Sequence, residues 1–251
     1  MSCVNIRGCC IGEGRPKVII PIVDPTETAI LEKAAEFSTL RADCVEWRID
    51  CFEGAKDLPA IVHCAAKLRV ALKDKLLLFT FRTKAEGGKV PLAHEEYLHF
   101  IRTVLATDCA DLIDIEFFTA GPELPVLIEE AHTAGAAVVC SSHDFHKTPP
   151  RTELVSRMLQ MQQAGADLPK LAVMPRCRTD VLELLAATAE MADQHPETPV
   201  VTMSMGALGA VSRLSGEAFG SAMTFANPGQ ASAPGQVSLD VVNEVLDALH
   251  L

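Results

Sequence analysis

The chain is 251 residues long, about the length of one α/β barrel, and 49% of its residues are hydrophobic, enough for a sizeable core. Its 22 basic and 33 acidic residues give a net charge of −11, the wrong sign for binding nucleic acid or an anionic membrane surface. We therefore expect one domain over residues 1–251, with no nucleic-acid or membrane partner.

The N-terminal segment and the cysteines favour a protein of the cytoplasm. The first ten residues lack the apolar stretch of a secretion signal, and the long uncharged segments contain too much Gly, Ser, Thr and Pro to span a membrane. The nine cysteines are odd in number and too sparse for a disulfide scaffold, so we expect reduced, buried thiols. Neither Cys9 and Cys10 nor His143 and His146 have further ligands at metal-binding spacing, so we expect no metal site.

Short β-rich runs repeat along the whole chain and predict the strands of a barrel. Their first residues lie roughly 30 positions apart, the length of a βα unit. The repeat favours an α/β fold, a closed (β/α)8 TIM barrel. An open doubly wound sheet usually has a Gly-rich turn after its first strand, whereas Asp24, Pro25 and Thr26 stand there in this chain. The predicted strands are Val18 to Val23, Cys44 to Ile49, Leu76 to Phe81, Leu112 to Phe117, Ala136 to Ser142, Lys170 to Met174, Val200 to Ser204 and Ala222 to Phe225.

Amphipathic patterns between these runs predict the helices. A weaker, glycine-interrupted helix is expected over Leu208 to Leu214. Residues typical of helix N-caps stand at Thr26, Thr152, Thr179 and Ser238. The predicted helices are Thr26 to Phe37, Pro59 to Leu72, His94 to Thr107, Glu123 to Thr133, Thr152 to Ala164, Thr179 to Gln194 and Ser238 to Leu249.

Charged residues interrupt strands that should be continuously apolar when buried. Glu46 and Arg48 stand two positions apart on the second strand, so both point to the same face. Asp114 and Glu116 repeat this spacing on the fourth strand. Because an unpaired buried charge costs several kcal/mol, charges of both signs on inner faces indicate a paired polar cluster.

Each polar residue on its own also fits an ordinary structural role. Lys170 alone is better explained as a solvated residue at the bottom of the barrel, and His143 alone fits a strand end as well as catalysis. Asp114 and Glu116 fit carboxylates that brace neighbouring cations. One Lys, one His, two inner-face carboxylates and two arginines all fall on strands of one barrel. Together they favour an active site, because inward residues near strand ends converge on one pocket.

A lysine that lines the barrel predicts Schiff-base chemistry. Burial beside other cations disfavours the ammonium form, so we expect Lys170 to have a lowered pKa and to attack a ketone as the neutral amine. The iminium acidifies the neighbouring C–H and requires a base of near-neutral pKa, which a histidine supplies. Arginines hold a carboxylate by bidentate contact, so the expected substrate is a small keto acid.

Seven sequence strings resemble those of type I 3-dehydroquinate dehydratases, in the family's order and spacing over nearly the whole chain. They are Glu46-Trp-Arg-Ile-Asp50, Phe79-Thr-Phe-Arg-Thr-Lys-Ala-Glu-Gly-Gly88, Ser142-His-Asp-Phe-His-Lys-Thr-Pro149, Gly165-Ala-Asp-Leu-Pro-Lys-Leu-Ala-Val-Met-Pro175, Thr202-Met-Ser-Met-Gly206, Ser212-Arg213 and Ala231-Ser-Ala-Pro-Gly-Gln236.

The resemblance implies a (β/α)8 barrel enzyme that dehydrates 3-dehydroquinate to 3-dehydroshikimate in the shikimate pathway. Lys170 would form the imine, His143 would remove and return the proton, and Glu86 would orient His143. The family works without a metal or organic cofactor and is commonly dimeric, so we expect a homodimer. The residues implied to bind substrate are Glu46, Arg48, Arg82 and Arg213, Ser232 and Gln236 on a closing loop, and the apolar Met203 and Phe225.

Two other interpretations remain open from the sequence. A class I aldolase would use the same lysine, but such barrels normally hold a phosphate on backbone amides near the last two strands. A non-catalytic binding protein would keep the pocket without forming an imine. Borohydride trapping and an assay for the conjugated enone acid distinguish these alternatives.

Overall fold

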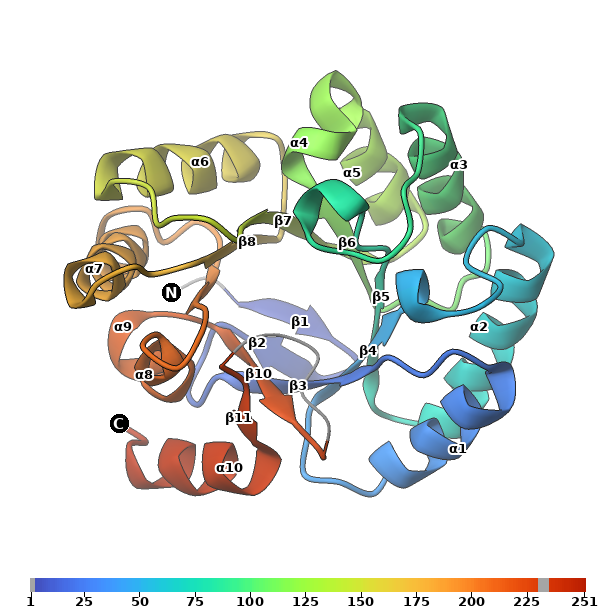
Figure 1. The fold of residues 1–251 in the computed structure, drawn as a ribbon, viewed down its shortest axis with the longest axis horizontal. Helices are drawn as coiled ribbons and strands as arrows, with labels where there is room; N and C mark the ends of the chain where they lie inside the picture. Colours follow the sequence, from blue (N-terminus) through green and yellow to red (C-terminus); the bar gives the residue numbers. More distant parts are fainter. Residues whose placement is uncertain (1–2, 230–234) are drawn as a thin grey trace.

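Parallel strands form a ring that is surrounded by helices (Figure 1). The computed structural model describes residues 3–229 and 235–251. Within these residues, the TIM barrel predicted from the sequence is confirmed. The strands of the ring are β3 (Lys17–Ile22), β4 (Cys44–Arg48), β5 (Leu76–Thr80), β6 (Leu112–Glu116), β7 (Ala137–Asp144), β8 (Leu168–Val173), β9 (Val201–Ser204) and β10 (Met223–Asn227).

The strands pair in chain order from β3 to β9, and β10 pairs with β3. The ring closes between β9 and β10 through a parallel bridge of Val200 with Ser221 and a 2.8 Å hydrogen bond from Ala222 N–H to the Val200 carbonyl. A two-residue strand, β11 (Val237–Ser238), extends the sheet beyond β10. All strand ends on one side of the ring therefore converge on one opening.

Helices cover the outside of the ring (Figure 1). None of those in the described residues is long and apolar enough to cross a membrane. The α-helices are α1 (Glu27–Phe37), α2 (Leu58–Leu72), α3 (His94–Leu105), α4 (Phe117–Ala120), α5 (Leu124–Thr133), α6 (Arg151–Gln163), α7 (Arg178–Gln194), α8 (Ala210–Leu214), α9 (Gly216–Phe219) and α10 (Leu239–Ala248); the 3₁₀ helices are η1 (Ile49–Cys51), η2 (Lys84–Glu86) and η3 (Gly121–Glu123).

The predicted helix starts are accurate to within a few residues. Thr26 caps α1 by accepting a hydrogen bond from the Ala29 N–H, and Ser238 is the N-cap residue of α10. The prediction of Thr152 and Thr179 as N-caps is wrong, because α6 and α7 each begin one residue earlier. The extra residue shifts both hydroxyls into the first turn.

Side-chain alternation along the strands separates two apolar layers. On β5, Leu77 and Phe79 pack outward against the helices, whereas Leu76 and Leu78 pack in the barrel interior. This alternation follows from the two-residue period of a strand. The same period turns the polar residues of β4 and β6 toward the interior.

A β-hairpin at the N-terminus closes the end of the barrel where the strands begin. It consists of β1 (Val4–Ile6) and β2 (Cys9–Ile11) and lies across the ring in Figure 1. Ile11 is fully buried in the same apolar cluster as Leu76 and Leu112 at the strand starts. The sequence analysis predicts no element for this segment, because three-residue strands carry too little periodicity to be recognised.

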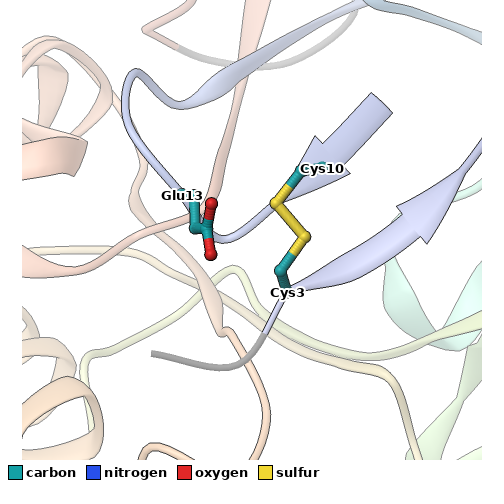
Figure 2. Close-up of side chains that lie close together, drawn as sticks. All are labelled: Cys3, Cys10 and Glu13. Carbon is teal, nitrogen blue, oxygen red and sulfur yellow. A yellow bond between two sulfur atoms is a disulfide. The ribbon is translucent and has the colours of Figure 1, made fainter. Parts of the chain in front are cut away.

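Cys3 and Cys10 form a disulfide beside Glu13 (Figure 2). The prediction that all nine cysteines are reduced is therefore wrong for this pair, because the hairpin turn brings the two thiols together. Burial is also overstated, since Cys177 is exposed and Cys9 and Cys109 are only half-buried. The other free cysteines of the described residues, Cys44, Cys51, Cys64 and Cys140, are buried as expected.

Two strand boundaries differ from the predicted ones and affect the candidate site. β7 continues to Asp144, so His143 lies inside the strand rather than after it. β8 begins at Leu168, so Lys170 is its third residue. Pro169 is tolerated within β8, although proline lacks the N–H that a central strand normally donates. His143 and Lys170 therefore both lie in strands whose backbones pair with each other, which holds them in place.

Candidate active site

A cavity of about 200 Å³ opens within the barrel and collects the polar residues of the strands. Every predicted site residue that the structure describes lines it, and Ser232 lies outside the described residues. The lining residues that the sequence predicted are Glu46, Arg48, Arg82, Glu86, His143, Lys170, Met203, Arg213, Phe225 and Gln236.

Lys170 is almost completely enclosed in the barrel. It is 2% exposed, and its ammonium nitrogen lies 3.1 Å from Asp114 Oδ2 and 4.7 Å from the centre of the Phe225 ring. The structural interpretation of Lys170 as a solvated residue is therefore wrong. The sequence predicts other cations beside Lys170, but the structure also pairs it with the carboxylate of Asp114, because β6 and β8 flank β7 and turn both side chains into the interior.

Asp114 is bound by three side chains in the floor of the cavity. It accepts hydrogen bonds from Lys170, from Arg82 Nη2 at 2.8 Å and from Ser141 Oγ at 2.6 Å. Burial opposes its ionisation, but the charges of Arg82 and Lys170 and the hydrogen bonds lower the pKa of Asp114 to about 2. The carboxylate is therefore negatively charged at neutral pH.

Glu116 fixes Arg82 from the other side. Arg82 Nη1 donates to Glu116 Oε1 at 2.8 Å, and Glu116 also accepts from the backbone N–H of Thr83 and from the hydroxyls of Thr83 and Thr119. Burial by itself would lower the pKa of Arg82, but the charges of Asp114 and Glu116 outweigh this effect and raise the pKa above its usual value. Asp114 and Glu116 thus form the predicted paired cluster, and Arg82 is held rigidly at the cavity wall.

His143 is held by Glu86 through two contacts. Glu86 Oε2 accepts the backbone N–H of His143 at 3.0 Å and lies 2.8 Å from its Nδ1. Burial raises the pKa of Glu86 to about 8, although the nearby Arg82 opposes the shift. Burial, followed by the charges of Arg82 and Lys170, lowers the pKa of His143 well below its usual value. The imidazole is therefore neutral at neutral pH.

Register places His143 beside Lys170 along two neighbouring strands. Ser141 pairs with Lys170, and His143 pairs with Ala172, so all four side chains share the inner face. The His143 ring stacks on Phe145, with 6.4 Å between ring centres. A neutral base and a buried amine thus face one cavity.

Gly87 permits the turn that carries Glu86. It ends η2 with a φ of 87°, in the left-handed region that glycine adopts without strain. A Cβ at this position would also lie 2.5 Å from the Phe145 ring. The close approach of this turn to β7 explains how Glu86 reaches His143.

Glu46 and Arg48 lie on the inner face of β4, as predicted from their spacing. Thr80 Oγ1 donates to Glu46 Oε1 at 2.8 Å. Arg48 forms a bidentate pair with Asp50, at 2.8 and 2.9 Å. Both side chains line the cavity and provide one acceptor and one cation for polar groups of a ligand.

Arg213 supplies a second buried cation at the cavity wall. It lies on the short helix α8, is 1% exposed, and its Nη1 contacts Met203 Sδ at 3.6 Å. Burial lowers the pKa of Arg213 to about 10, so the guanidinium stays charged at neutral pH. A guanidinium is suited to a carboxylate, because the planar fork binds two oxygens at once.

Within the described residues, one cluster has the spacing of a metal site, and it lies outside this cavity. The Cys3 and Cys10 sulfurs and a Glu13 oxygen lie within 4.8 Å of one another (Figure 2). Both sulfurs belong to the disulfide, so neither is a thiolate ligand.

The sequence missed several residues that complete the cavity. Gly87, Phe145, Ala172 and Met205 also line it. Ser141 binds Asp114 beneath it. Ala172 lies two positions after Lys170, and Ser141 lies two positions before His143. The two-residue period of a strand could therefore have placed both on the inner face. Phe145 and Met205 lie in loops, where no periodic pattern exists.

The sequence profile of type I 3-dehydroquinase matches residues 18–251. The chain belongs to the type I 3-dehydroquinase family. It is 46% identical to the 3-dehydroquinate dehydratase of Bacillus subtilis over 250 residues, which cover 100% of this chain and 98% of the relative. The Salmonella agona enzyme of the same name is 42% identical, with 100% and 99% coverage. Membership makes this type I dehydroquinase a lyase.

Solved structures of the dehydroquinase family share the whole fold. The type I 3-dehydroquinate dehydratase of Clostridium difficile, crystallised with covalently modified comenic acid, is 42% identical, with a TM-score of 0.96 and coverage of 99% and 98%. The Enterococcus faecalis enzyme is 41% identical, with a TM-score of 0.93 and coverage of 99% and 100%. Both share the dehydroquinase barrel over nearly the whole of this chain.

Proposed function

We propose that this dehydroquinase converts 3-dehydroquinate to 3-dehydroshikimate through an imine on Lys170, with His143 as the general base and acid. The observation that carries the proposal is the enclosure of the Lys170 amine in the same cavity as a neutral imidazole. A lysine attacks ketones and a neutral histidine removes protons, and no further reagent is required. The covalent comenic acid of the Clostridium difficile relative supports covalent chemistry in this family.

The reaction conserves charge at the lysine nitrogen in its first half. Lys170 loses a proton and attacks the ketone. That proton and a second N–H proton pass to the former carbonyl oxygen, which leaves as water while the nitrogen lone pair forms the C=N bond, so ammonium and ketone become iminium and water. The iminium then withdraws electrons from the adjacent carbon, and His143 removes a proton there. The electrons of that C–H bond form a C=C bond and expel the β-hydroxyl, to which His143 returns the proton. Water releases the product and restores the amine.

Glu86 positions His143 for this step. An ionised Glu86 accepts the Nδ1–H of His143, which leaves the lone pair of Nε2 to act as the base. The same carboxylate stabilises the imidazolium after proton transfer. The backbone N–H of His143 adds a second hydrogen bond to Glu86 and fixes the pair.

The other lining residues suit a polyhydroxylated keto acid. We assign the carboxylate to Arg213 and the hydroxyls to Glu46, Arg48 and Arg82, with Met203 and Phe225 as apolar walls. Gln236, together with Ser232 outside the described residues, is assigned to the loop over the bound ring. Uncharged hydroxyls match the acceptor Glu46 and the donor Arg48 of β4. The carboxylate of Glu46 would instead repel a phosphate.

We further propose that the chain forms one catalytic domain over residues 1–251, works as a homodimer in the cytoplasm, and serves the shikimate pathway without a metal or organic cofactor. These proposals follow from membership in the family and not from the geometry of the cavity. Sedimentation of the purified protein tests the dimer. Activity that survives dialysis against a chelator tests independence from metals.

An enone assay combined with trapping tests the proposed reaction. Purified protein with 3-dehydroquinate should produce the ultraviolet absorbance of a conjugated enone acid, and borohydride should add the mass of the reduced substrate to Lys170. Absence of the absorbance together with aldol cleavage would identify an aldolase. Turnover without an adduct, or an adduct on a different lysine, would remove Lys170 from the mechanism.

A further inference from the structure

A charged group next to the cavity-lining Lys170 has no role in the proposed reaction. Asp114 does not line the cavity, so it does not touch a bound substrate; it lies beneath Lys170 with 0% exposure. Its Oδ2 is 3.1 Å from Lys170 Nζ. We propose that Asp114 is the counter-ion of the reacting nitrogen, pairing first with the Lys170 ammonium and then with the iminium formed from it.

The chemistry of imine formation favours a fixed anion. An ammonium and a ketone become an iminium and water, so the nitrogen carries one positive charge before and after the step. A carboxylate at a fixed position therefore stabilises both states without moving. A buried positive charge that lacked such a partner would be strongly destabilised. This inference rests on the proposed function, because it concerns the same lysine.

The surrounding hydrogen bonds keep Asp114 ionised and immobile. Ser141 Oγ binds its Oδ1 at 2.6 Å, and Arg82 Nη2 shares its Oδ2 with Lys170 at 2.8 Å. Its pKa of about 2 means that it does not accept the proton that Lys170 loses before attack. That proton needs another acceptor, and the neutral His143 in the same cavity fits.

The other carboxylates near Lys170 are engaged elsewhere. Glu46 binds Thr80, Glu86 binds His143, and Glu116 binds Arg82. In the described part of the chain, Asp114 is the carboxylate that forms an ion pair with Lys170. The groups that line the cavity with this lysine are Glu46 and Arg48 of β4, Arg82 and Glu86 after β5, His143 of β7 and Arg213 of α8.

Asp114→Asn removes the counter-ion but keeps the shape of the side chain. We would measure the rate at which cyanoborohydride, which reduces an iminium, traps 3-dehydroquinate on Lys170 as a function of pH. Without the anion the ammonium loses its proton more readily, so the acid limb of the rate profile should move to lower pH by about one unit or more. The plateau rate should fall about tenfold or more, because the iminium loses its partner.

Glu116→Gln is the matched control. Glu116 is as buried as Asp114 and binds the same Arg82, but no ion pair joins it to Lys170. Its substitution by Gln removes the same charge as Asp114→Asn. This variant should keep the acid limb near the wild-type position even if its rate is lower. A limb that stays unshifted in Asp114→Asn, or that shifts equally in both variants, would overturn the role of Asp114.

Two further measurements keep the outcomes separate. Where Asp114→Asn does not fold, Ser141→Ala removes the hydroxyl bound to Asp114 Oδ1 and should shift the limb in the same direction by a smaller amount; no shift would contradict the proposal. Wild-type protein that forms no adduct on Lys170 would refute the proposed imine itself. An adduct on Lys170 of the wild type, combined with an unshifted acid limb in Asp114→Asn, would refute the counter-ion role of Asp114 and leave the imine mechanism intact.

Discussion

Glu86 and His143 are joined through a single carboxylate oxygen, Glu86 Oε2, which accepts the backbone N–H of His143 at 3.0 Å and lies 2.8 Å from Nδ1 of its ring. One oxygen thus fixes both the main chain and the side chain of the proposed base. The tautomer of His143 depends on whether Glu86 carries a proton, since an ionised Glu86 accepts from Nδ1–H and a protonated one donates to Nδ1.

The first prediction concerns the pH dependence of turnover. Burial raises the pKa of Glu86 to about 8, so below this pH the carboxyl donates to Nδ1 and the proton on Nε2 blocks the base. Above it, the carboxylate accepts from Nδ1–H and frees Nε2. We therefore expect kcat/KM to rise with pH through about 8 in the wild type and Glu86→Gln to lose this limb.

Glu46→Gln is the control for the pH profile. Glu46 is another carboxylate of the cavity, but it binds Thr80 rather than His143. The control should keep the limb even where turnover is slower. A limb that persists in Glu86→Gln would show that a different group controls it.

The second prediction separates imine formation from proton transfer. His143→Ala should still form a borohydride adduct on Lys170, because the amine is retained, but it should turn over at least ~100-fold more slowly, the usual size of a lost acid–base group. His146→Ala is the control, since His146 is an exposed neighbour on the same segment. Near-normal turnover of His143→Ala would exclude His143 as the base.

The third prediction concerns recognition of the substrate carboxylate. Arg213→Lys keeps a positive charge but loses the bidentate fork, so KM for 3-dehydroquinate should rise about 10-fold or more while kcat falls less. Arg178→Lys, an exposed arginine at the start of α7, should leave KM near the wild-type value. Steady-state kinetics test both variants, and an unchanged KM in Arg213→Lys would assign the carboxylate to another residue.

The fourth prediction concerns the disulfide of the N-terminal hairpin. Denatured protein without reductant should show the seven free thiols of the described structure, and nine after reduction. Cys3→Ser should lower the free energy of unfolding by about 2 kcal/mol, because the cross-link closes only a short loop. Cys177→Ser is the control, since Cys177 is exposed and free. Nine titrating thiols without reductant would contradict the pairing.

Strand periodicity explains why much of the site could be predicted. Alternation places Glu46 with Arg48, and Asp114 with Glu116, on inner faces. The cavity lining confirms this for the first pair, and the hydrogen bonds of Asp114 and Glu116 to the cavity-lining Arg82 confirm it for the second. Periodicity does not define where a strand begins, so the sequence places Lys170 at a strand start although it is the third residue of β8. A shift of two residues preserves the face but changes the depth in the barrel.

By itself, the sequence determined the number and order of the βα units, the inward face of each strand and the residue types available for imine chemistry, because these follow from local periodicity and composition. Only the tertiary structure decided which charges pair: Asp114 with Lys170, Glu86 with His143, and Cys3 with Cys10. Closing the barrel brings together residues that lie far apart in the chain, such as Asp114 and Lys170, which are 56 positions apart. Such distances carry no signal in a single sequence, since the partner of a buried charge is set by the curvature of the sheet and not by spacing along the chain.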